Sequence, residues 1–327
     1  MTKYRTLPRP LVAVVILALA VVASGTPDGP IQAVATFSVL GDMVSRIGGE
    51  HVAVTTLVGS EGDTHVYKPT PAAARAVSQA HLLVVNGLDF EGWLDRLIEA
   101  SDFGGVRVVA TAGIEPVTLE MDRDHDPGHG NGESVEGRSG EHHEHEHEHE
   151  HGAVDPHAWQ SLRHAVTYVD NITEALAKAD PENANTFRRN RTDYVAEIEA
   201  LDAELRAMFD DLPPGSRTII TSHDAFRYFG HDYGLTFIAP QGVTTASEAS
   251  AQDVARLIEL IRDQGIRAVF PENVADPRLL KRIAEETGAT VGGTLYPSTL
   301  SGPDGPAPTY LDMMRHNART LAQALLK

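Results

Sequence analysis

Three histidines stand in polar loops beside segments that the sequence predicts to be strands or helices. His65 follows an expected strand, His157 precedes an expected helix, and His223 ends the first expected strand of the second half of the chain. Ligands of open α/β sheets collect at the carboxyl ends of the strands, so these three side chains can converge between two halves of the molecule. Three neutral imidazoles and one further ligand complete a tetrahedral zinc site. A lone loop histidine is more often a surface residue, so the hypothesis depends on all three together.

The absence of cysteine narrows the chemistry of any metal site. The chain has 0 cysteines among 327 residues, so thiolate ligands, disulfides and lipidation on cysteine are all excluded. Imidazole and carboxylate ligands remain. They suit zinc, or manganese where carboxylates dominate.

The charge of the chain excludes a second class of function. A formal net charge of −19 repels nucleic-acid phosphates, so no nucleic-acid partner is expected. The same charge suits a cationic ligand.

The first 25 residues are typical of a secretory signal peptide. A basic start with Lys3, Arg5 and Arg9 precedes the apolar stretch 11–22, and small residues follow at 23–25. Twelve apolar residues are too few to span a bilayer, which needs about 20. We therefore expect a mature protein that is free in the periplasm and not lipidated.

Short apolar runs alternate with helical patterns along the rest of the chain, which predicts an α/β fold with mostly parallel sheets. The expected strands are 31–37, 52–58, 82–86, 106–110, 217–223, 235–239, 267–270 and 290–295. The expected helices are 39–48, 71–79, 91–101, 158–178, 181–211, 250–264, 277–287 and 307–326.

The helix expected at 181–211 is long enough to be a rigid connection between two lobes. Asp180 and Pro181 predict its start, and apolar residues from Phe187 to Met208 recur at spacings of three, four and seven. We therefore expect an N-terminal α/β lobe at 31–178, a linking helix at 181–211 and a C-terminal α/β lobe at 212–327, with the metal site in the cleft between the lobes.

Residues 120–152 interrupt the first lobe. They hold eight of the 16 histidines among acidic residues and glycines and lack apolar periodicity, which predicts a disordered loop. His143 opens a formal H-E-x-x-H pattern, but a protease motif of this kind lies on a buried helix with apolar neighbours, which this segment lacks. Either the loop is simply a solvated acidic segment, or it binds zinc weakly and raises its local concentration; we favour a binding role.

Four motifs together resemble the metal-specific solute-binding proteins of ABC transporters, the zinc and manganese group. They are GDTHVYKPTP, VDPHAWQS, TSHDAFRYFG and PDGPAPTYLDMMRHN, and the resemblance covers about 31–327. It implies two α/β lobes joined by one long rigid helix, and His65, His157 and His223 as the metal ligands. Zinc-type members often carry a histidine-rich acidic loop in the place of 120–152.

One position departs from the pattern of this family. Many members supply a fourth ligand, an aspartate, where this chain has Ser298. A water molecule or a nearby carboxylate can take this position. Glu272 is the strongest local carboxylate, although a hydrogen bond to a ligand imidazole suits it better, and Asp304 is a weaker alternative. Three nitrogens without an obligatory carboxylate favour zinc over manganese.

The sequence therefore predicts a binding protein, and not an enzyme, that captures Zn²⁺ and delivers it to an ABC permease. A periplasmic metallochaperone is a further candidate partner. The alternative is a zinc-dependent hydrolase, which would also need a general base near a metal-bound water.

Overall fold

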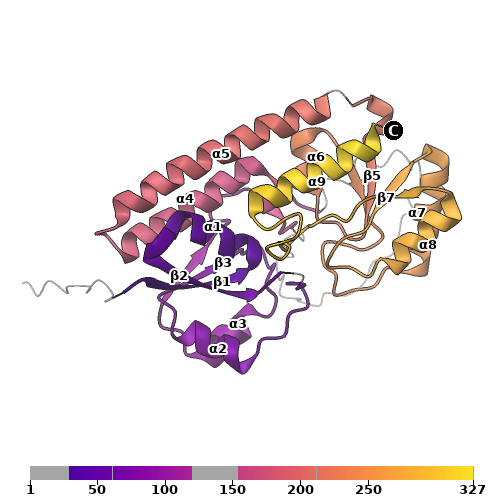
Figure 1. Cartoon of the computed structure of the whole chain (residues 1–327). Helices are drawn as coiled ribbons and strands as arrows, with labels where there is room; N and C mark the ends of the chain where they lie inside the picture. The colour runs from indigo at the N-terminus through magenta and orange to yellow at the C-terminus, as the bar shows by residue number, and fades with distance from the viewer. Residues whose placement is uncertain (1–28, 61, 120–153, 211, 327) are drawn as a thin grey trace, which may run out of the picture.

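The computed structural model describes residues 29–60, 62–119, 154–210 and 212–326. The chain forms two lobes, each built on a four-stranded parallel sheet, and one long helix runs past both (Figure 1). This confirms the two-lobed α/β fold that the sequence predicts. The expected signal peptide and the segment 120–152 lie outside the described residues. Within the described part, no helix combines the length and apolar character needed to cross a membrane.

The N-terminal sheet has the strand order β2-β1-β3-β4. Its strands are β1 (Ile31–Phe37), β2 (Val52–Val58), β3 (Leu82–Val85) and β4 (Val106–Val109). Every residue of β1 except Gln32 is buried, because helices cover both faces of the sheet and a central parallel strand then has no polar face.

Helices α1 and α4 cover one face of this sheet, and α2 and α3 cover the other (Figure 1). They are α1 (Ser38–Gly48), α2 (Pro71–Ser78), α3 (Leu94–Ser101) and α4 (Leu162–Ala179). The side chains of Thr70 and Ser161 cap α2 and α4 by accepting backbone N–H groups of the first turn.

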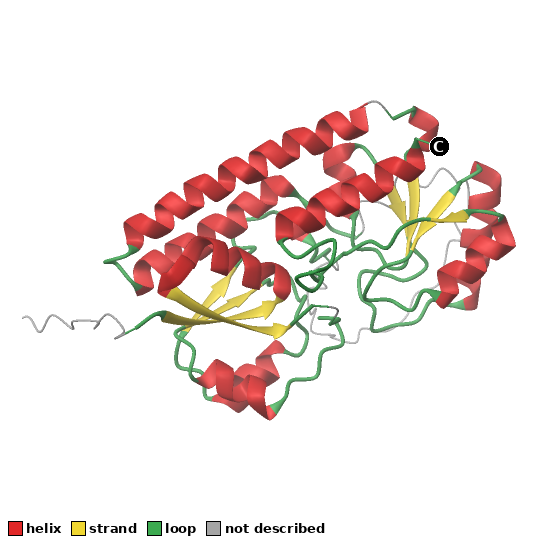
Figure 2. Cartoon of the chain, in the orientation of Figure 1, coloured by secondary structure: helices red, strands yellow, loops and turns green. Residues whose placement is uncertain are grey.

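The C-terminal sheet repeats the same arrangement with the order β6-β5-β7-β8. Its strands are β5 (Thr218–Thr221), β6 (Thr236–Ile238), β7 (Ala268–Phe270) and β8 (Thr290–Val291). Its helices are α6 (Arg227–Tyr233), α7 (Ala251–Gln264), α8 (Arg278–Thr287) and α9 (Tyr310–Leu325). Its strands have two to four residues, whereas those of the N-terminal sheet have four to seven; Figure 2 shows both sheets in yellow.

The long helix is α5 (Ala184–Asp210), which packs against α1 and α4 in one half of the molecule and against α6 and α9 in the other. Its buried residues, among them Phe187, Ile198 and Leu205, follow helical spacing. At ~1.5 Å per residue its 27 residues extend over roughly 40 Å.

Two sequence-based expectations about helices are wrong. The long helix begins at Ala184 and not at Pro181, because the backbone N–H and side-chain amide of Asn183 donate to the Asp180 carboxylate at 3.2 and 2.6 Å and close a separate turn. Helix α6 was not expected, since its seven residues are too few to show a helical period. It folds because Phe226 and Phe229 are fully buried beside Phe237 and Phe209.

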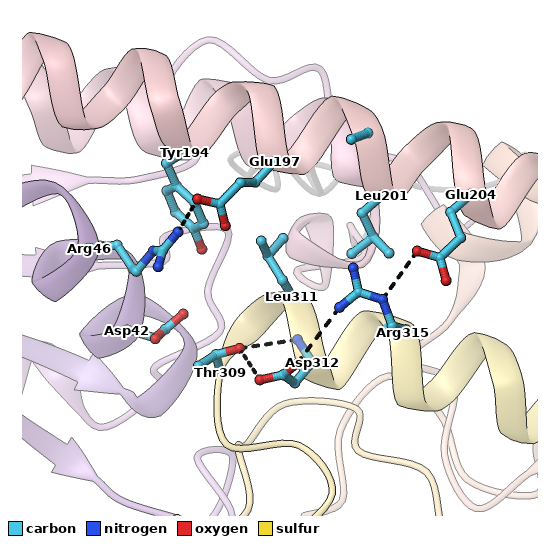
Figure 3. A pocket seen from close by; sticks show the side chains of 11 residues that line it. Asp42, Arg46, Tyr194, Glu197, Leu201, Glu204, Thr309, Leu311, Asp312 and Arg315 are labelled. Atoms are coloured by element: carbon cyan, nitrogen blue, oxygen red, sulfur yellow. Dashed lines mark hydrogen bonds and ion pairs between the residues drawn. The ribbon is translucent and has the colours of Figure 1, made fainter.

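A polar cavity of about 400 Å³ lies where α5 passes α1 and α9 (Figure 3). Glu197 and Glu204, seven residues apart and so on one face of α5, pair with Arg46 of α1 at 2.5 Å and with Arg315 of α9 at 3.2 Å. The Tyr310 N–H at the start of α9 donates to Asp42 of α1 at 2.9 Å. These contacts join the two lobes on the α5 side of the molecule.

Candidate metal centre

Three histidines from separate loops meet at the junction of the lobes. His65 lies in the segment between β2 and α2, and His157 precedes the 3-10 turn Ala158–Gln160. His223 follows β5 of the C-terminal sheet, where an isolated parallel bridge pairs it with Gln241. One possible ligand atom of each histidine lies within 4.8 Å of those of the other two. Among the described residues this is the one cluster of three or more potential metal ligands.

The spacing of the imidazoles suits a single small cation. The Nε2 atoms of His65 and His157 lie 3.3 Å apart, and the three ring centroids are separated by 5.3, 5.4 and 5.6 Å. Two nitrogens bound at 2.0–2.1 Å to one tetrahedral zinc ion would be about 3.3–3.4 Å apart. His157 and His223 are fully buried, whereas His65 is half-buried and so marks the solvent side of the cluster.

In two of these rings, Nδ1 contacts a carboxylate. The Asp155 Oδ1 atom lies 2.7 Å from Nδ1 of His157, and it also accepts the backbone N–H of His157 at 2.9 Å. Nδ1 of His223 contacts the Glu272 carboxylate in the same way. In the neutral form of each ring Nδ1 is therefore the protonated nitrogen, and the lone pair of Nε2 is available to a metal ion.

Glu272 is held firmly in this role. Its Oε1 atom accepts the backbone N–H groups of Ser222 and His223 at 3.1 and 3.2 Å, and its Oε2 atom faces Nδ1 of His223. Since both oxygens are occupied, Glu272 orients an imidazole and is not itself part of the cluster. Nε2 of His223 is buried and has no hydrogen-bond partner in the described structure.

The surroundings decide which protonation state each imidazole prefers. Burial, and next the proximity of His157 and His223, lowers the pKa of His65 to about 2. Burial also lowers the pKa of His157 well below its usual value. Burial opposes a charge on His223 too, but the Glu272 carboxylate outweighs it and raises the pKa of His223. At neutral pH, His65 and His157 are therefore neutral and ready to act as ligands.

The two residues that flank Ser298 bond to sequence neighbours of His157 and Glu272. Pro297, just before it, accepts hydrogen bonds from the Trp159 and Gln160 side chains at 2.8 and 2.5 Å, close to His157. Thr299, just after it, accepts one from Asn273 at 2.9 Å, next to Glu272. The Ser298 hydroxyl is fully buried and has no hydrogen-bond partner in the described structure. A buried hydroxyl without a partner costs free energy, so a further group that bonded to it would stabilise this position.

The other candidate residues lie elsewhere. Asp304 is exposed and is not part of the cluster. The five other histidines of the described residues also lie outside it, and two of them bond to the backbone: His81 Nδ1 accepts the Gln32 N–H at 3.0 Å, and His316 Nε2 donates to the Thr294 carbonyl at 2.9 Å. Sequence reasoning missed Asp155, although an aspartate two residues before a candidate ligand in VDPH was a usable signal.

Two parallel-sheet lobes with one long helix and a histidine cluster at their junction define a two-lobed metal-binding protein. Solved structures of this class are similar to the chain. One is the periplasmic zinc-binding protein TroA from Treponema pallidum, with a TM-score of 0.78 and 25% identity over 91% of this chain and 99% of that chain. Another is the Mn-bound periplasmic metal-binding protein from Candidatus Liberibacter asiaticus, with a TM-score of 0.74 and 29% identity over 90% and 98%.

The chain belongs to the family described as "ZnuA: Zinc-uptake complex component A periplasmic", whose model matches residues 33–324. Its relatives include the iron-binding protein YfeA of Yersinia pestis, 31% identical over 89% of this chain and 85% of that protein. The manganese-binding lipoprotein MntA of Halalkalibacterium halodurans is 29% identical over 95% and 97%. Members of this family are metal-ion solute-binding proteins of ABC transporters and not enzymes, which confirms the expectation of a binding protein.

Proposed function

We propose that this protein captures Zn²⁺ outside the cytoplasm with His65, His157 and His223 and delivers the ion to an ABC-type importer. The observation that carries the proposal is the convergence of three imidazoles, one ligand atom of each within 4.8 Å of the others. Asp155 and Glu272 orient two of these rings through Nδ1. This is the hydrogen-bonding pattern that supports metal-ligating histidines in general.

The ligand types favour zinc over manganese. Zinc accepts three imidazoles readily, whereas manganese prefers carboxylate, carbonyl and water oxygens. Both carboxylates nearest the rings already hold imidazole nitrogens, and the hydroxyl of Ser298 is a poor substitute for a carboxylate ligand. Relatives are named for iron, manganese and zinc, so the choice of metal is a property of each chain and is tested below.

A fourth position completes the proposed site. Ser298 is a candidate for it from the C-terminal lobe, with a buried hydroxyl that lacks a partner in the described structure. A water molecule held between this hydroxyl and the ion would satisfy both. This arrangement leaves one ligand exchangeable, which suits an ion that must be released.

The family supports the proposed permease partner, whereas the metallochaperone is a proposal without such support. An ABC permease is the acceptor, and a periplasmic metallochaperone is a candidate donor. The signal sequence at 1–25 and the absence of cysteine support a protein that is free in the periplasm, whereas several relatives are named lipoproteins. The histidines of segment 120–152 would bind further zinc weakly and raise its local concentration.

The hydrolase alternative is not carried further, because family members are binding proteins. The site agrees with this, since Asp155 and Glu272 are engaged with His157 and His223 and neither is placed as a free general base.

The decisive experiment measures zinc stoichiometry and affinity by competition with a chelator for the wild type and for His65→Ala, His157→Ala and His223→Ala. Each change should weaken the tight site more than about 100-fold, because even the residues that only orient a ligand are worth 10–100-fold. His164→Ala, a half-buried histidine outside the cluster, is the matched control and should bind like the wild type. Tight binding that survives all three changes would exclude the proposed site.

A further inference from the structure

One carboxylate connects the most exposed histidine of the cluster to the opposite lobe. Asp63 Oδ1 accepts the backbone N–H of His65 at 2.9 Å, and Asp63 Oδ2 accepts the hydroxyl of Thr245 at 2.5 Å. The two hydrogen-bonded side chains are 182 residues apart in the sequence. Asp63 lies in the segment after β2 of the N-terminal lobe, and Thr245 lies between β6 and α7 of the C-terminal lobe.

The loop that carries Thr245 contacts the backbone of the segment after β5 that carries His223. Gln241 pairs with His223 in a parallel bridge, and the Asp224 N–H donates to the Gly242 carbonyl at 3.1 Å. The hydrogen bond between Asp63 and Thr245 therefore links the backbone of His65 to the structure that positions His223.

The position of His65 depends on this link, because within the described part of the chain His65 lacks the orienting carboxylate that each of the other two histidines has. Carboxylates hold the Nδ1 atoms of His157 and His223, but no carboxylate contacts Nδ1 of His65 among the described residues. The position of His65 is set through its backbone by Asp63, through the Trp93 indole that donates to the Thr64 carbonyl at 2.8 Å, and through packing on Phe90. Of these three residues, Asp63 is the one whose side chain itself hydrogen-bonds to a described residue of the other lobe.

We propose that Asp63 and Thr245 form a clasp across the two lobes that keeps His65 on the bound ion and slows its release. Thr245 is thus a positioning residue that acts through Asp63. This inference rests on the proposed zinc-binding function. When the clasp opens, the loop with His65 can leave the cluster while His157 and His223 keep their orienting carboxylates, which gives the ion a route out on the side where the cluster is most exposed.

The test compares zinc release from full-length variants mixed rapidly with an excess of chelator. Thr245→Val keeps the shape of the side chain and removes the hydroxyl, and a lost hydrogen bond to a charged group predicts release about tenfold faster. The association rate should stay close to that of the wild type, because the hydrogen bond acts at the exit step.

Thr244→Val is the matched control. Thr244 is equally half-buried, and its hydroxyl accepts the Ala246 N–H at 3.2 Å within its own loop. Thr245→Ser restores a hydroxyl. Both variants should release zinc within about twofold of the wild-type rate.

The clasp is refuted if Thr245→Val releases zinc at the wild-type rate, or if Thr244→Val accelerates release equally, since the effect would then come from the loop in general. Failure of the proposed function looks different: the wild type itself would lack a tight zinc site, or His157→Ala would retain it.

Discussion

Glu272 and His223 contact each other twice: one carboxylate oxygen accepts the backbone N–H of His223 at 3.2 Å, and the other faces Nδ1 of its ring. Both residues are almost completely buried. The pair fixes at once the path of the chain after β5 and the orientation of an imidazole in the cluster. The same carboxylate therefore supports the fold and the proposed zinc site.

Glu272→Gln keeps the size of the side chain, so it should show the effect of the carboxylate on the fold and on zinc binding without a change in packing. An amide has one oxygen, so it cannot accept from both the backbone and the ring, and one buried donor loses its partner. We expect zinc affinity to fall 10–100-fold and the melting temperature of the metal-free protein to fall as well, measured by chelator competition and calorimetry. Glu259→Gln, at an exposed position of α7, should change neither quantity. Unchanged zinc affinity in Glu272→Gln would mean that His223 does not need its carboxylate.

Acidification should destabilise the metal-free protein in part through His65. Burial, followed by the proximity of His157 and His223, lowers its pKa from 6.5 to about 2 in the folded chain. Between these values the unfolded chain binds the proton and the folded chain does not, so stability falls as the pH drops below about 6.5. The melting temperature of metal-free His65→Gln should therefore fall less steeply with pH than that of the wild type.

Asp155 changes the pH dependence of stability in the opposite direction. Its contribution should cancel when the wild type is compared with His65→Gln. Burial raises its pKa from 3.8 to about 6 in the folded chain, so its contribution grows as the pH falls through this range. Both proteins retain Asp155, and the difference between their two pH profiles isolates His65. Parallel profiles would contradict the prediction.

Ser298→Asp should change the choice of metal. A carboxylate at this buried position would add an oxygen ligand, which manganese prefers, and the Zn²⁺/Mn²⁺ affinity ratio should fall by about tenfold or more. Without a metal the same carboxylate is buried and unpaired, so the metal-free protein should melt at a lower temperature and recover when metal is added. Ser298→Asn has the same size without the charge and should leave the ratio near that of the wild type. An unchanged ratio in Ser298→Asp would place Ser298 outside the coordination sphere.

Deletion of residues 125–151 should remove weak zinc sites and spare the tight one. The eight histidines of this segment and the acidic residues among them offer many weak registers for chelation, whereas His65, His157 and His223 form their cluster within the described residues, outside this segment. Calorimetric titration should show fewer weak equivalents and the same high-affinity step. Loss of the high-affinity step would show that the segment belongs to the site.

Local patterns in the sequence were enough to predict most of the fold. The apolar runs at 31–37 and 52–58 became strands with those bounds, because a parallel strand covered on both faces must be apolar along its length. The long amphipathic stretch became α5, because seven turns of one-sided apolar residues leave few alternatives. The turn that delays the start of α5 to Ala184 was missed, because it depends on how a single side chain, Asp180, bonds locally.

For the site, the sequence by itself determined the three candidate histidines and their places next to strands and helices. Only the tertiary structure decided that they meet, that Asp155 and Glu272 hold two of them, and that Asp63 of one lobe bonds Thr245 of the other. The physical reason is range: helix and strand formation depends on residues a few positions apart. The contact between Glu272 and His223, 49 residues apart, exists only after β5 and β7 have paired, and the histidine cluster exists only after the two lobes have packed.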